Sequence, residues 1–75
     1  MRPLDALELE QAGKLLFGER WQSELARAIG VTDRLVRMWV AGKSPPRPAV
    51  RGKIVELLRA RQEEITAVLR ALEAD

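Results

Sequence analysis

Residues 45–48 of this chain have the sequence Pro-Pro-Arg-Pro, and this run constrains the fold more than any other feature. Proline lacks the backbone N–H that a helix needs and restricts the residue before it, so no helix can pass through this segment. Pro48 itself suits the first turn of a new helix. Because no proline follows it, we expect helix over residues 48–73, either as one helix or as two that bend near residues 59–62.

The composition of the chain favours helix throughout. Ala, Leu, Glu and Arg dominate, Tyr is absent, and Val, Ile and Thr are sparse. A chain of 75 residues has room for one hydrophobic core, which gives only modest stability unless something such as dimerisation supplements it. We therefore expect residues 1–75 to form a single all-α domain, a small helical bundle of four to five helices.

Several function classes are disfavoured by residues that the chain lacks. It contains no cysteine and no histidine, which removes thiolate metal sites and the commonest general base. The remaining carboxylates form no paired motif, and no phosphate-binding glycine loop is present, so we expect no enzyme, cofactor, metal or small-molecule ligand. No apolar run approaches the roughly 18 residues of a membrane span. The first residues lack the apolar core of a signal peptide, and a cytoplasmic location is expected.

Glycines divide the part before the prolines into three short helical segments. The first is expected over about residues 4–17, and its apolar stripe consists of Leu9, Ala12, Gly13 and Leu16. A glycine inside a helix costs about 1 kcal/mol relative to alanine, so Gly13 indicates close approach by a neighbouring helix. Gly18 is suited to the C-cap of this helix.

Two further helices are expected over residues 22–28 and 33–41. Gly30 suits the positive φ of a tight turn between them, and Thr32 is a natural N-cap for the second of the two. Val36 and Trp39 have the spacing of a buried helix face. Two short helices joined by such a turn form a helix-turn-helix, which residues 22–41 would make here.

Positive charge is concentrated in the middle of the chain. Residues 27–53 hold seven basic residues against Asp33 alone, a net charge of +6, whereas residues 1–26 and 54–75 each carry a net charge of −2. A basic region between acidic flanks is typical of a protein that binds a polyanion. The alternative is that these basic residues only solvate one face.

Residues 22–39, Gln-Ser-Glu-Leu-Ala-Arg-Ala-Ile-Gly-Val-Thr-Asp-Arg-Leu-Val-Arg-Met-Trp, resemble the lambda-repressor/Cro-like (XRE-type) family of helix-turn-helix regulators. Gly42 and Pro45 match the same pattern, and the resemblance covers about residues 17–48. It implies that Gln22 contacts a phosphate and braces the next helix. Two positions depart from the pattern: Trp21 replaces the usual Ser or Thr cap and could pack as an apolar staple, and Val40 stands where a polar residue is common.

The expected DNA contacts form two sets. The base-contacting candidates are Asp33, Arg34, Arg37 and Met38, since arginine can pair with guanine, aspartate with the cytosine amino group, and methionine with the thymine methyl. The phosphate-contacting candidates are Gln22, Thr32, Lys43, Ser44, Arg47 and Arg51. The arginines could instead be solvated helix residues, and Met38 could belong to the core.

The last segment carries an apolar stripe on alternating spacings of three and four, interrupted by Arg61. Its members are candidates for a dimer interface: Ile54, Leu58, Ile65, Val68, Leu69 and Leu72. The alternative is that the stripe folds back to cover the domain's own core.

Together these features predict a sequence-specific regulator of transcription that binds double-stranded DNA through the major groove. We expect a repressor that binds a palindromic operator as a homodimer. The alternative keeps the same fold as a protein-interaction module, such as an antitoxin or an adaptor subunit.

Overall fold

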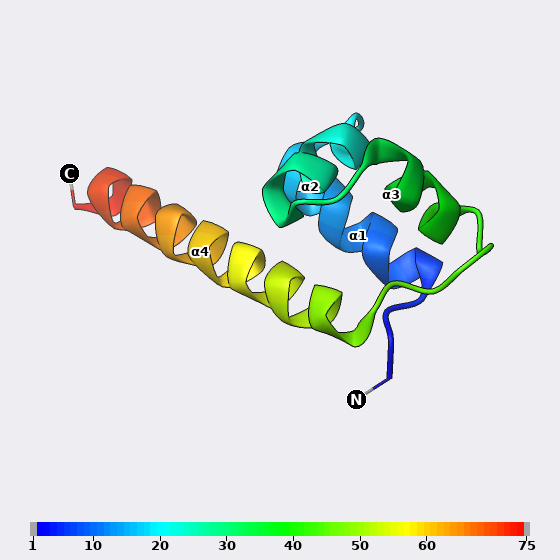
Figure 1. The fold of residues 1–75 in the computed structure, drawn as a ribbon. Coiled ribbons are helices and arrows are strands. Elements are labelled where there is room, and N and C mark those ends of the chain that lie inside the picture. Colours follow the sequence, from blue (N-terminus) through cyan, green and yellow to red (C-terminus); the bar gives the residue numbers. More distant parts are fainter. Residues whose placement is uncertain (1, 75) are drawn as a thin grey trace.

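The protein forms four helices and no strand within residues 2–74, the part of the chain that the computed structural model describes. The helices are α1 (Ala6–Phe17), α2 (Trp21–Ile29), α3 (Asp33–Val40) and α4 (Pro48–Glu73) (Figure 1). The predicted all-α class is confirmed, although positions 1 and 75 of the predicted domain lie outside the described residues. The region after the prolines is one continuous helix, which decides between the two alternatives for it.

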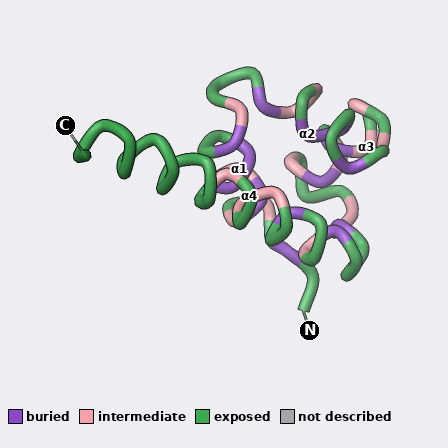
Figure 2. The backbone as a smooth tube through the Cα atoms, turned by 90° about the vertical axis from the view of Figure 1, so that its left-hand side faces the viewer, coloured by how far each residue is buried: buried purple, intermediate pink, exposed green. Residues whose placement is uncertain are grey.

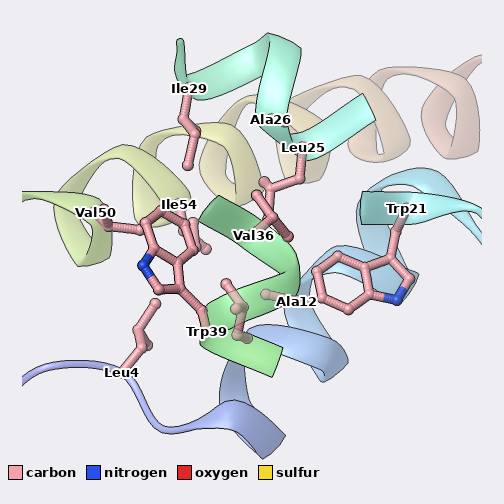
Figure 3. Packing of buried hydrophobic residues seen from close by; sticks show 11 residues of the cluster. Leu4, Ala12, Trp21, Leu25, Ala26, Ile29, Val36, Trp39, Val50 and Ile54 are labelled. Carbon is pink, nitrogen blue, oxygen red and sulfur yellow. The ribbon is translucent and has the colours of Figure 1, made fainter. Parts of the chain in front are cut away.

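One hydrophobic cluster joins all four helices and the segment before α1. Its buried members are Leu4, Leu9, Ala12, Trp21, Leu25, Ala26, Ile29, Val36, Trp39, Val50 and Ile54. Figure 3 shows the Trp39 ring of α3 grouped with Leu4 and with Val50 and Ile54 of α4. The first half of α4 therefore closes a core that α1, α2 and α3 begin.

The second half of α4 has no such cover. Every residue from 62 to 74 is exposed, and this part of the helix extends away from α1, α2 and α3 (Figures 1 and 2). The molecule is elongated as a result, with extents of 50 × 27 × 20 Å.

The first helix begins two residues later than expected because Asp5 caps it. The Asp5 carboxylate accepts a hydrogen bond from the Glu8 N–H (2.8 Å), and the Glu8 carboxylate accepts one from the Asp5 N–H (3.2 Å). This reciprocal pair is a capping box, which satisfies two N–H groups at the helix start. Leu4 thus stands outside the helix but is buried in the core.

Basic side chains of α4 fasten it to the ends of the other helices. Lys53 donates to the carbonyl of Ile29 at the end of α2 (3.2 Å), and Arg61 donates to the carbonyl of Leu16 near the end of α1 (2.8 Å). The last carbonyls of a helix have no partner within it and carry partial negative charge, so both contacts are favourable. They hold α4 at a defined position against α1 and α2.

Gly13 allows α1 and α2 to approach closely, as its place inside a helix predicted. A Cβ atom added at this position would overlap with the Trp21 ring, which lies at the start of α2 and is only 2% exposed. Trp21 therefore packs against α1, and the α1–α2 crossing depends on the missing side chain.

We predict that Gly13→Ala destabilises the protein by about 1–3 kcal/mol, because the overlap with Trp21 outweighs the better helix propensity of alanine. Thermal or urea unfolding followed by circular dichroism measures the change. Gly52→Ala is the matched control, since Gly52 lies in α4 with open space around its Cα atom, and this variant should gain up to about 1 kcal/mol. Equal stability of Gly13→Ala and the parent would contradict the proposed crossing.

Candidate nucleic-acid interface

The turn between α2 and α3 consists of Gly30, Val31 and Thr32. Gly30 adopts the left-handed conformation (φ 76°, ψ 35°), which is accessible to glycine without a steric penalty. The Thr32 hydroxyl accepts a hydrogen bond from the Leu35 N–H (3.1 Å) and caps α3. Both sequence predictions for the turn are confirmed.

A hydrogen bond between side chains joins the starts of the two helices. The Ser23 hydroxyl, in the first turn of α2, donates to the Asp33 carboxylate, in the first turn of α3 (2.7 Å). The contact is partly buried and spans ten positions of sequence. It fixes the first turn of α3 to α2, and the residue pattern did not predict it because Asp33 was expected to face a base.

The two faces of α3 differ sharply. Val36 is fully buried and Trp39 is 4% exposed. The opposite face presents Arg34 and Arg37, which are one turn apart, and Ala41, which is one further turn along and just past the helix. These three residues are exposed, and Met38 lies half-buried between them. The expectation that Trp39 belongs to the core is confirmed, and Val40 is half-buried and packs against the core rather than facing outward.

Asp33 lies at the border between the outward face and the buried face of α3. It is half-buried and its carboxylate is bound by Ser23, while helical spacing places it about 40° around the axis from Arg37 and about 60° from Val36. Asp33 therefore has a structural role in placing α3, and its base contact stays a prediction. The outward face consists of Arg34, Arg37, Met38 and Ala41, and Ala41 is the member that the sequence analysis missed.

The start of α2 has no side-chain cap. Arg20 occupies the N-cap position without a cap hydrogen bond, and Trp21, which replaces the usual Ser or Thr cap of the pattern, is buried against α1. The first N–H groups of α2 therefore lack a side-chain acceptor, and a helix N-terminus of this kind favours an anion. Gln22 lies half-buried in this first turn, and its phosphate contact stays a prediction.

The loop between α3 and α4 lies beside the α2–α3 turn. A shallow groove between them is lined by residues of both segments, including Thr32, Ser44 and Arg47. Lys43 and Arg47 are exposed, Ser44 is half-buried, and the backbone N–H of Lys43 donates to the Met38 carbonyl (3.0 Å). The structure therefore brings four predicted phosphate-contacting residues, Thr32, Lys43, Ser44 and Arg47, to the two ends of α3.

Arg51 is the exception among the predicted phosphate contacts. Its Nε–H donates to the carbonyl of Arg2 (3.1 Å), and its guanidinium lies 3.6 Å from the Glu8 carboxylate, which Arg2 also binds. Only 20% of the Arg51 side chain is exposed. The prediction for Arg51 is wrong because this side chain holds the segment before α1 against α4.

Contacts within the chain divide the seven basic residues of the middle region into two groups. Three have partners: Arg27 pairs with Glu24, Arg51 binds Arg2, and Lys53 binds Ile29. The other four are Arg34, Arg37, Lys43 and Arg47. Within residues 2–74 these four make no ion pair and no side-chain hydrogen bond, and all are exposed. They lie on α3 and on the loop that follows it.

The predicted dimer candidates also divide into two groups. Ile54 is 3% exposed inside the core, so its side chain forms no open surface and the prediction for Ile54 is wrong. Leu58 is half-buried against the core. Ile65, Val68, Leu69 and Leu72 are 51–72% exposed. The fold-back alternative thus holds for the first half of the stripe only.

No family model, curated protein or solved structure matches this chain. Among the described residues, no helix has the length and apolar character to cross a membrane, and no group of three or more acidic side chains could hold a metal ion.

Protonation of Glu8 should release the segment before α1. The pKa of Glu8 is lowered from 4.5 to about 2, first by the hydrogen bond from the Arg2 guanidinium and next by the Asp5 N–H. A carboxylate with a lowered pKa stabilises the fold fully above its unfolded pKa, and this contribution disappears as the pH falls from about 4.5 to 2.

We therefore expect Glu8→Gln to be less stable than the parent at pH 6, with a difference in melting temperature that shrinks below about pH 4.5 and vanishes near pH 2. Unfolding of both proteins across this pH range measures it. In an Arg2→Ala background the same substitution should have a smaller effect, because the main partner of Glu8 is gone. A pH-independent difference would show that the carboxylate charge is not responsible.

Proposed function

We propose that this protein binds double-stranded DNA in a sequence-specific manner and regulates transcription, with residues 22–41 acting as a helix-turn-helix and α3 as the helix in the major groove. The observation that carries the proposal is the set of four exposed, unpartnered basic residues Arg34, Arg37, Lys43 and Arg47 on α3 and the following loop. Contacts with phosphates and bases would supply the partners that they lack within the described chain.

The way in which α3 is held against the rest of the domain supports its role as the helix in the major groove. Val36 and Trp39 bury one side of the helix, Thr32 caps its first turn, and the Ser23–Asp33 hydrogen bond ties that turn to α2. Base contacts require side chains on a rigid element, because small displacements break paired hydrogen bonds. α3 meets this requirement while its opposite face stays open.

The outward face of α3 has the chemistry for base contacts. Arg34 and Arg37 can each donate two hydrogen bonds to the edge of a guanine, and Met38 and Ala41 can lie against thymine methyl groups. Gln22, Thr32, Lys43, Ser44 and Arg47 are placed around both ends of the helix, where phosphates on either side of the groove would lie. An operator half-site that contains G·C pairs follows from this arrangement.

The same proposal includes membership of the lambda-repressor/Cro-like family and repression in the cytoplasm by a homodimer on a palindromic operator. One small helical domain contacts few base pairs, so two copies on half-sites about one turn apart would supply the affinity. A second candidate function, a protein-interaction module such as an antitoxin or an adaptor, is favoured by the exposed apolar half of α4.

Arg37→Ala should weaken binding to the preferred operator by about 1–3 kcal/mol and relax base preference at one position of each half-site. Selection from a random pool of double-stranded DNA defines the operator, and mobility-shift titrations with the parent and variant give the change. Arg70→Ala is the matched control, since it removes the same charge from an exposed part of α4 far along the chain from α3.

If the pool yields no enriched sequence, the DNA-binding proposal is overturned. If variants of Arg34 and Arg37 keep the full activity of the protein in the cell while substitutions in the exposed half of α4 abolish it, the protein acts as a protein-interaction module instead.

Lys43→Ala should instead weaken binding to all sequences about equally, because a phosphate contact carries no base information. The slope of log K against log salt should become shallower by about 1 for each copy bound. Titrations at several salt concentrations on operator and unrelated DNA measure both effects. A change in base preference with an unchanged salt slope would contradict the assignment of Lys43.

A further inference from the structure

The apolar stripe of α4 runs from the core into solvent and is interrupted only by Arg61. Ile54 and Leu72 are 18 residues apart, which is about five whole helical turns, so both side chains leave the helix in the same direction. Val50 and Ile54 on this side are buried against the other helices. Beyond Arg61, which donates to Leu16, the same side presents Ile65, Val68 and Leu72 with Leu69 at its edge, all exposed.

This exposed half of the stripe adjoins a shallow groove where α4 meets α1. The groove is lined by Leu15 of α1, which is 76% exposed, and by Val55, Leu58, Gln62 and Ile65 of α4. Apolar surface therefore extends from the tip of α4 to the side of α1. A single copy of the chain leaves all of it in contact with water.

We propose that a second copy of this chain covers this surface, and that the two α4 helices pair in antiparallel orientation through their exposed halves. Each copy's α1, α2 and α3 lie on the very side of α4 that carries the stripe. In a parallel pair the two sets of helices would occupy the same space between the α4 helices. In an antiparallel pair they lie at opposite ends, and each tip points towards the groove of the other copy.

The charges along the stripe favour the same orientation. Arg61 lies on the stripe at the base of the exposed half, and 40% of its side chain is exposed. A parallel pair in register would place the two Arg61 guanidinium groups opposite each other. An antiparallel pair places each beside the tip of the other α4, where Glu73 and the negative C-terminal end of the helix lie.

These contacts define a register for the pair. With Arg61 opposite Leu72 of the second copy, Ile65 lies opposite Val68 of the second copy, and the two-fold axis passes near residues 66 and 67. Glu64, on the flank of the stripe, then faces Ala71 of the second copy rather than another charge. The paired length of about 20 Å corresponds to the part of α4 beyond Arg61.

Sedimentation equilibrium in the absence of DNA tests the pairing, with Val68→Glu as the variant and Ala67→Glu as its control. The two positions are adjacent and exposed, and the same charge is added, but Ala67 lies on the far side of α4 from the stripe. We expect the parent and Ala67→Glu to be dimers, and Val68→Glu to dissociate about 100-fold or more readily, since both copies lose an apolar contact. Circular dichroism checks that both variants are folded.

Disulfide formation tests the orientation, because the parent chain has no cysteine and any disulfide must join two copies. An equimolar mixture of Arg61→Cys and Leu72→Cys should form a cross-linked dimer much faster than either variant alone, as two Leu72 positions in an antiparallel pair are about 16 Å apart along the axis. Equal cross-linking by Leu72→Cys alone would indicate a parallel pair and overturn the proposal.

A parent chain that sediments as a monomer up to millimolar concentration would also overturn the proposal and leave this face to another partner. The homodimer of the proposed function relies on this pairing, but the measurements use no DNA. A DNA-binding monomer and a dimer without DNA affinity are therefore distinct outcomes.

Discussion

The burial of Val36 and Trp39 is the interaction on which the rest of the structure depends. A helix of eight residues has no stability of its own in water, so α3 exists because one side of it completes the core. The Trp39 ring joins α3 to Leu4 and to the first half of α4, and Val36 joins it to the centre of the cluster. The face that carries Arg34 and Arg37 is held in place by residues that never meet a ligand.

Local signals were sufficient for most of the fold. Gly13, Gly30, Thr32 and the prolines each specify a backbone feature within a few residues, and each was found where it was expected. The hydrogen-bond partner of a long polar side chain could not be predicted from such local signals, because that partner can lie far away in the sequence. Arg51 shows this: its charge suited a phosphate, yet it is 49 positions from the carbonyl that it binds.

The same limit applies to the candidate interface. Arg34, Arg37 and Met38 could be assigned to the outer face from helical spacing alone, whereas the hydrogen bond of Asp33 could not be predicted because its partner, Ser23, belongs to another helix. For α4, periodicity identified the apolar stripe but not the point at which the other helices stop covering it. That point is decided by the length of α1, whose end Arg61 binds.

Because both the buried and the exposed half of the stripe lie on one continuous helix, the direction in which the exposed half faces depends on the number of residues between them. A single residue inserted between Leu58 and Ile65 would leave the core intact and rotate everything beyond it by about 100°. The number of residues in this short stretch therefore determines the angle, around the helix axis, between the side of α4 that packs in the core and the side that its exposed half presents to a partner. Insertions and deletions here would change the direction in which the exposed half of the stripe faces, while the residues of the core and of the exposed half would stay the same.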